Sequence, residues 1–123
     1  MDLNKLYNIA ERENIDVYNF KMDKTKARIV EYQGTHIFMD YSQIDTSSEE
    51  KCLFAEELGH YFYHAYYSLS SSQTLIDKQE YKAKKYSYNI LIPFEKLKSA
   101  ILKRDWYNLY SCRIFWSYRR IHE

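Results

Sequence analysis

The pattern of hydrophobic and polar positions predicts an α+β fold. Residues 3–13 place apolar side chains at helical spacing, which indicates an amphipathic helix at the start of the chain. Three runs rich in stiff and aromatic residues, typical of strands, follow at 17–20, 27–32 and 36–41. Gln33-Gly34 separates the last two runs and suits a tight turn, so a β-hairpin is expected over about residues 27–41. We therefore expect a small antiparallel sheet packed with helices.

Two longer helices are expected after the hairpin. The first begins at Ser47, because Ser47 and Glu50 have the spacing of a capping box and acidic residues favour a helix N-terminus. It should extend to about Tyr67, with an apolar stripe made of Phe54, Leu58, Tyr61, Phe62 and Ala65. The second helix spans about residues 77–91 and must stop near Pro93.

Length and composition indicate a single domain over residues 1–123. The chain contains one proline and two glycines, which excludes glycine-rich phosphate loops and flexible linkers. No apolar run approaches the length of a membrane helix, and the polar start does not resemble a signal peptide. We therefore expect a cytoplasmic protein that has no membrane partner and keeps Cys52 and Cys112 as thiols.

Charge is unevenly distributed along the chain. Residues 1–80 carry 8 basic and 14 acidic side chains, whereas residues 81–123 carry 10 basic and 3 acidic ones. Within the second part, residues 94–123 form a tail rich in Trp, Tyr and Arg, for which one or two further helices are expected. Such a basic segment can attract nucleic acid or an acidic protein surface, or it can be the solvated face of helices.

The candidate chemistry lies in the middle helix, in the run from Glu56 to His60. Its sequence E-E-L-G-H is similar to the H-E-x-x-H motif, in which residues four apart bind one metal ion and the second residue is the general base. Glu56 and His60 would then be ligands and Glu57 the base. Glu-Glu pairs and histidines also occur on ordinary helix surfaces. His64 follows one turn later and is either an alternative partner for His60 or a bystander, since three ligands along one helix would span about 12 Å.

Two motifs together resemble the ImmA/IrrE family of metallo-endopeptidases. The run F-A-E-E-L-G-H-Y over residues 54–61 is similar to that family's active-site helix. The run from Glu80 to Pro93 is similar to its second pattern, E-x-x-A-x-x-F-A-x-x-L-L-x-P. Ala83 and Ser87 are small and one turn apart, which allows two helices to approach closely. The resemblance covers about residues 1–93, leaving 94–123 as a divergent tail, and implies that Glu80 is a third metal ligand. The alternative for Glu80 is a solvated carboxylate near a helix start.

The resemblance implies a zincin-like fold and a zinc-dependent endopeptidase that cleaves a helix-turn-helix repressor of a phage, mobile element or stress regulon. The ligand set would be Glu56, His60 and Glu80, with Glu57 as catalytic base. Glu56 stands where the family usually has histidine, although related phage-type sequences resemble this one there. Two carboxylates neutralise the charge of a divalent ion, so the ion should lower the pKa of its bound water less. The additional oxygen donor should also make Mn²⁺ or another harder ion more competitive with zinc. The strand at 36–41 could offer its edge to an extended substrate.

Two other functions remain open at this point. The missing first histidine and the tail suggest a catalytically weak or inactive peptidase fold that binds a regulatory protein without cutting it. The interleaved aromatic and basic residues of 81–120 suggest the weaker alternative of nucleic-acid binding.

Overall fold

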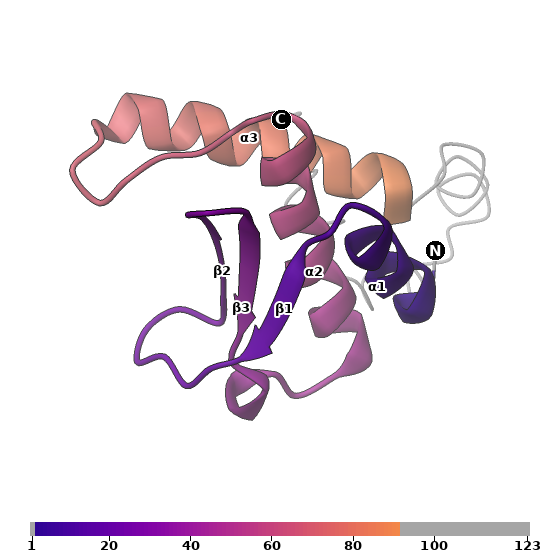
Figure 1. The fold of residues 1–123 in the computed structure, drawn as a ribbon. Coiled ribbons are helices and arrows are strands. Elements are labelled where there is room, and N and C mark those ends of the chain that lie inside the picture. Colours follow the sequence, from indigo (N-terminus) through magenta and orange to yellow (C-terminus); the bar gives the residue numbers. More distant parts are fainter. Residues whose placement is uncertain (1, 92–123) are drawn as a thin grey trace, which may run out of the picture.

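The computed structural model describes residues 2–91, which form an α+β domain as predicted (Figure 1). The elements in chain order are α1 (Leu3–Arg12), β1 (Asp16–Asn19), β2 (Ala27–Glu31), β3 (Thr35–Met39), the 3₁₀ turn η1 (Tyr41–Gln43), α2 (Ser47–Phe62) and α3 (Gln73–Leu91). The predicted tail helices, Pro93 and Cys112 lie outside the described residues. None of the helices within residues 2–91 is long and apolar enough to cross a bilayer.

The sheet has three strands in the order β1-β3-β2. The predicted hairpin is confirmed, since β2 and β3 pair antiparallel around Gln33 and Gly34, which both have positive φ. β1 adds a parallel strand on the other side of β3, so the sheet is mixed and not wholly antiparallel. The reason is topological: the chain reverses direction between β1 and β2, and β3 inserts between them.

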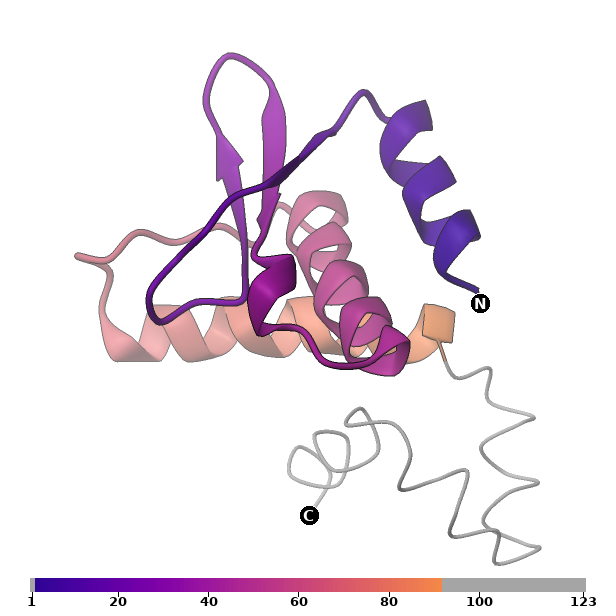
Figure 2. The ribbon, with the colours of Figure 1, turned by 90° about the horizontal axis from the view of Figure 1, so that it is seen from below.

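The core lies between the sheet, α1 and α2 (Figures 1 and 2). Its fully buried side chains include Leu6, Ile37, Met39, Phe54 and Leu58. Most of the predicted stripe of α2 faces this core or its margin, but Phe62 is 36 % exposed because it lies at the end of the helix. In Figure 1, α3 crosses α2 near the C-terminal end of α2, where Gly59 lies against Ala83.

The start of α2 differs slightly from the prediction. The N-cap is Thr46, whose Oγ1 accepts a hydrogen bond from the backbone N–H of Glu49 at 3.1 Å. The predicted N-cap at Ser47 is therefore wrong by one residue, and Glu49, not Glu50, is the residue whose N–H the cap accepts. Glu49 and Glu50 still place acidic side chains in the first turn, where they favour the helix dipole.

The end of α2 comes earlier than predicted, at Phe62 instead of about residue 67. The N–H of His64 donates to the carbonyl of Tyr61, and the N–H of Ala65 donates to the carbonyl of His60 at 2.8 Å. These are the two hydrogen bonds of a Schellman motif, and His64 occupies its left-handed position with φ of 50°. Because glycine usually fills that position, the sequence offers no visible stop signal here.

The start of α3 is also earlier than predicted, at Gln73 instead of about residue 77. Ser72 lies just before it, and its hydroxyl accepts a hydrogen bond from the N–H of Leu75 at 3.3 Å. The extra turn extends α3 at the end that precedes Glu80.

Candidate metal centre

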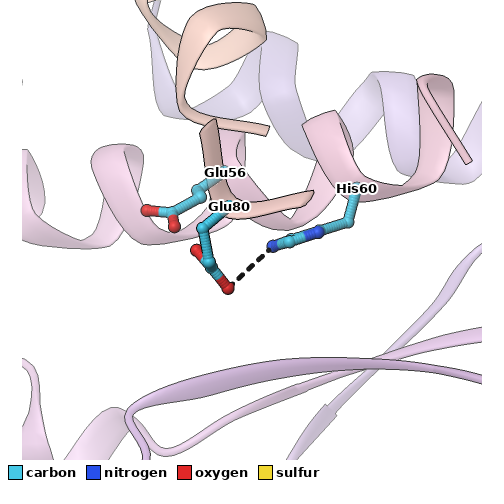
Figure 3. A group of neighbouring side chains, drawn as sticks. All are labelled: Glu56, His60 and Glu80. Carbon is cyan, nitrogen blue, oxygen red and sulfur yellow. Dashed lines mark ion pairs between the residues drawn. The ribbon is translucent and has the colours of Figure 1, made fainter. Parts of the chain in front are cut away.

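Three of the predicted site residues meet where α3 crosses α2. One ligand atom each from Glu56, His60 and Glu80 lies within 4.8 Å of the other two. In Figure 3, Glu80 of α3 lies between the two residues of α2, and the dashed line marks the ion pair of 3.4 Å between Glu80 Oε1 and His60 Nε2. His60 is buried, and the two carboxylates are partly exposed. The spacing of four within α2 and the crossing of the helices together produce this cluster.

The donor set fits a divalent cation. Because the three donors are at most 4.8 Å apart, an ion between them would lie no more than about 2.8 Å from each, whereas zinc bonds to nitrogen and oxygen are about 2.0–2.2 Å long. Each donor therefore has to move inward by at most about 0.7 Å, which small side-chain rotations provide. Two carboxylates and one imidazole are ligands suited to zinc and to harder ions such as Mn²⁺.

A close approach of the two helices positions Glu80. A Cβ placed on Gly59 would lie 2.5 Å from the carbonyl oxygen of Ala83 and 2.9 Å from its Cα. Ala83 and Ser87 are both buried in this contact, so the expectation that small residues allow close packing is confirmed. Glu80 lies one turn before Ala83 and is thereby directed towards His60.

The orientation of the His60 ring is fixed by the end of α2. His60 Nδ1 lies 2.6 Å from the carbonyl oxygen of Ala65, which is the residue whose N–H closes the Schellman motif. Since a carbonyl only accepts, Nδ1 carries the proton and donates it. Nε2 is the nitrogen directed at Glu80, and it is available to a metal ion once it is unprotonated.

The carboxylates of Glu56 and Glu80 share a proton in the absence of a cation. Burial, followed by the hydrogen bond to Glu80 and the charge of Glu80, raises the pKa of Glu56 to about 9. Burial opposes ionisation of Glu80, but hydrogen bonds from His60, Glu56 and Tyr67 outweigh it and lower the pKa of Glu80. Burial likewise lowers the pKa of His60, but the hydrogen bond to Glu80 and the charge of Glu57 outweigh this and raise it to about 9. At neutral pH, Glu56 and His60 therefore carry protons and Glu80 is ionised.

Glu57 lies beside the cluster and against the sheet. It is 9 % exposed, and burial raises its pKa to about 7, partly offset by the charges of His60 and Arg28 and by a hydrogen bond from the Ile29 backbone. A carboxyl group that titrates near neutral pH is suited to accept and return a proton. Glu57 lines the same cleft as the three donors.

This cleft has a volume of about 540 Å³ and lies between β2, the two helices and the segment after α2. β3 is paired on both sides, so the prediction that its edge receives a substrate is wrong; β2 is the edge strand next to the cluster. The backbone N–H of Asp40 donates to the Lys26 carbonyl, so Lys26 and Asp40 form a hydrogen-bonded pair. Along an antiparallel ladder, hydrogen-bonded pairs alternate with pairs that are not hydrogen-bonded. The backbone groups of Ala27 and Ile29 consequently face away from β3, on the side where Glu57 contacts the strand.

His64 and Cys52 lie outside the cluster. His64 is exposed, and its left-handed backbone belongs to the C-cap of α2, so it is a bystander with respect to His60 and Glu80. Cys52 lies two turns before His60 and is partly buried. Within residues 2–91, the group formed by Glu56, His60 and Glu80 is the one set of such side chains close enough to hold an ion.

The comparison with protein families agrees with this geometry. The family model of the IrrE N-terminal-like domain, a peptidase family, matches residues 10–119. The chain belongs to this family. The predicted resemblance is thus confirmed, and the match extends beyond the described residues into the basic tail. IrrE N-terminal-like domains are classed as peptidases, and the Glu-His-Glu cluster of this one is compatible with a metal site. No match was found among curated proteins or among solved structures.

Two groups in contact with the cluster were missed by the sequence interpretation. The carbonyl of Ala65 accepts from His60, and the hydroxyl of Tyr67 donates to Glu80. Neither contact has a signal in the sequence, because both depend on the reversal of the chain at His64.

Proposed function

We propose that this IrrE N-terminal-like domain is a cytoplasmic, metal-dependent endopeptidase whose substrate is a helix-turn-helix repressor. The observation that carries the proposal is the coincidence, in one cleft, of three candidate ligands, a buried carboxyl group and the edge of a strand. Glu56, His60 and Glu80 would hold the ion, zinc or a harder cation such as Mn²⁺. The repressor and its origin in a phage, mobile element or stress regulon follow from the family resemblance.

The residues of the cleft have distinct roles in this proposal. A divalent cation held by the three donors would polarise a peptide carbonyl and lower the pKa of a water molecule. Glu57 would accept a proton from that water at its carboxylate and donate it to the leaving amine, for which a pKa of about 7 is suitable. An extended peptide would pair with the outward backbone groups of Ala27, next to the Ile29 N–H that donates to Glu57, which places the peptide beside Glu57.

The substitution Glu57→Gln tests the proposal. The amide keeps the size of the side chain but cannot carry a proton between water and amine, so cleavage should fall by at least about a hundredfold while the fold and zinc binding persist. Glu50→Gln is the matched control, because Glu50 is a partly buried carboxyl group of the same helix that does not line the cleft. The purified full chain with Zn²⁺ is incubated with helix-turn-helix repressors from its own genome, and products are identified by mass spectrometry. Cleavage by Glu57→Gln at the wild-type rate would reject the role of Glu57.

A second function is favoured by one observation, the carboxylate of Glu56 where the family usually has histidine. Two carboxylates neutralise a divalent cation, which weakens its acidifying effect on water. The domain would then bind a regulatory protein without cutting it. In the same assay, capture of a repressor by the zinc-loaded wild-type chain without any product would support this function over the first. The nucleic-acid alternative depends largely on residues outside the described part and stays a prediction.

A further inference from the structure

We propose that Tyr67 is a positioning residue that holds Glu80 in place for the cation. The inference rests on the proposed function, because it concerns the same cluster, but it assigns a role to a side chain that lies outside both of the motifs, at 54–61 and 80–93. Tyr67 follows α2 by five positions and lines the cleft.

Two contacts place the Tyr67 side chain against the cluster. Its hydroxyl donates to Glu80 Oε1 at 2.5 Å, and this is the oxygen that also lies 3.4 Å from His60 Nε2. Its ring meets the His60 ring edge to face, with centroids 6.0 Å apart and planes at 69°. Tyr67 thus contacts one candidate ligand from each helix.

Tyr67 differs from the other partners of Glu80 in what happens when a cation arrives. His60 and Glu56 are themselves candidate ligands, so their donor atoms would turn to the cation and away from Glu80. The Tyr67 hydroxyl is not one of the three donors, and it donates to Glu80 from outside the group. Its hydrogen bond to Glu80 is therefore compatible with the loaded site.

The C-cap of α2 makes this contact possible. If α2 continued as a helix to residue 67, Tyr67 would lie about 10 Å further along the axis than His60, beyond the reach of Glu80. The Schellman motif with His64 at φ of 50° instead turns the chain back. The segment from residue 63 to 67 therefore supplies both the Ala65 carbonyl for His60 and the Tyr67 hydroxyl for Glu80.

The substitution Tyr67→Phe tests the inference, because it removes the hydroxyl and keeps the ring. Zinc affinity of the full chain is measured by competition with a chromogenic chelator, without any substrate. We expect Kd for Zn²⁺ to rise by about tenfold or more, as is typical when a partner of a metal ligand is lost. Tyr63→Phe is the matched control: Tyr63 is 50 % exposed, packs on Tyr86 and does not line the cleft, so its Kd should stay within about twofold of wild type.

A double-mutant cycle with Glu80→Ala separates positioning from a general structural effect. When Glu80 is absent, loss of the Tyr67 hydroxyl should no longer change the zinc Kd, whereas two independent effects would add. An unchanged Kd in Tyr67→Phe would overturn the inference, and so would a loss that persists in the Glu80→Ala background. A fall in kcat with unchanged zinc affinity would also overturn it, because the hydroxyl would then act on the substrate.

The inference and the proposed function fail in different ways. Zinc binding by the wild-type chain with unchanged affinity in Tyr67→Phe contradicts only the role of Tyr67. Zinc binding that does depend on Tyr67, with no cleavage of any repressor, supports the inference and contradicts the endopeptidase. If the wild-type chain binds neither Zn²⁺ nor Mn²⁺, both are overturned.

Discussion

Binding of zinc to this domain should release about two protons at neutral pH. In the metal-free cluster, Glu56 and His60 both have a pKa of about 9, so each carries a proton that it must lose to become a ligand. Glu80 has a lowered pKa and is already ionised. His60 Nδ1 keeps its proton, because it donates to the Ala65 carbonyl. The release therefore consists of one proton from Glu56 and one from His60 Nε2, with up to about half a proton more from Glu57, whose pKa of about 7 a cation would lower.

The sign and size of the pH dependence follow from this count. Protons compete with the cation below the pKa of each ligand, so affinity rises with pH until about 9. Two protons correspond to about a hundredfold change in Kd per pH unit, or about a thousandfold between about pH 6 and about pH 7.5. Ligands with ordinary pKa values, about 6.5 for His and 4.3 for Glu, would release only about 0.2 protons at pH 7.

Isothermal titration calorimetry in two buffers of different ionisation enthalpy measures the number of released protons directly. Chelator competition at several pH values gives the slope of log Kd independently. Glu56→Gln removes one titrating ligand and should reduce the release to about one proton. Tight binding with a release well below one proton in the wild-type chain would refute the pKa values assigned to the cluster and the shared proton between Glu56 and Glu80.

Two further predictions concern the helices that carry the site. Gly59→Ala should destabilise the fold by about 2 kcal/mol in urea denaturation, because its Cβ would meet the Ala83 backbone at 2.5 Å; the stabilisation of about 1 kcal/mol usual for Gly→Ala within a helix would contradict the close packing. His64→Gly should stabilise by about 0.5–1 kcal/mol, since glycine relieves the left-handed backbone at φ of 50°, and should leave zinc affinity unchanged. A weakened zinc Kd in His64→Gly would instead indicate that the imidazole takes part in binding.

Much of the fold could be predicted because its signals are local. The helical spacing in residues 3–13, the turn at Gln33-Gly34 and the small residues at positions 83 and 87 each act within a few positions of the chain. They led to α1, to the hairpin and to the close contact of α2 with α3, which the structure confirms. The family could be recognised from the sequence for the same reason, since its two motifs are short runs within single helices.

Where the predictions were wrong, the deciding contacts are distant in the chain or have no characteristic residue. α2 ends early because His64 adopts a left-handed conformation, which is usually found at glycine and is therefore not expected at a histidine. β1 lies beside β3, so β3 is paired on both sides, and this depends on the order of the strands in the sheet. That order determines that the edge beside Glu57 belongs to β2.

The sequence by itself determined which side chains can share a helix face, because the rise and turn of an α-helix place Glu56 and His60 together regardless of their surroundings. The family resemblance already named Glu80 as the third member, but only the tertiary structure shows that it lies beside Glu56 and His60, that the Ala65 carbonyl selects the nitrogen of His60 and that Tyr67 reaches Glu80. These contacts depend on where one helix crosses another and where the chain reverses. Such features arise from packing between segments, whereas the pattern of residues within one segment encodes mainly its own conformation.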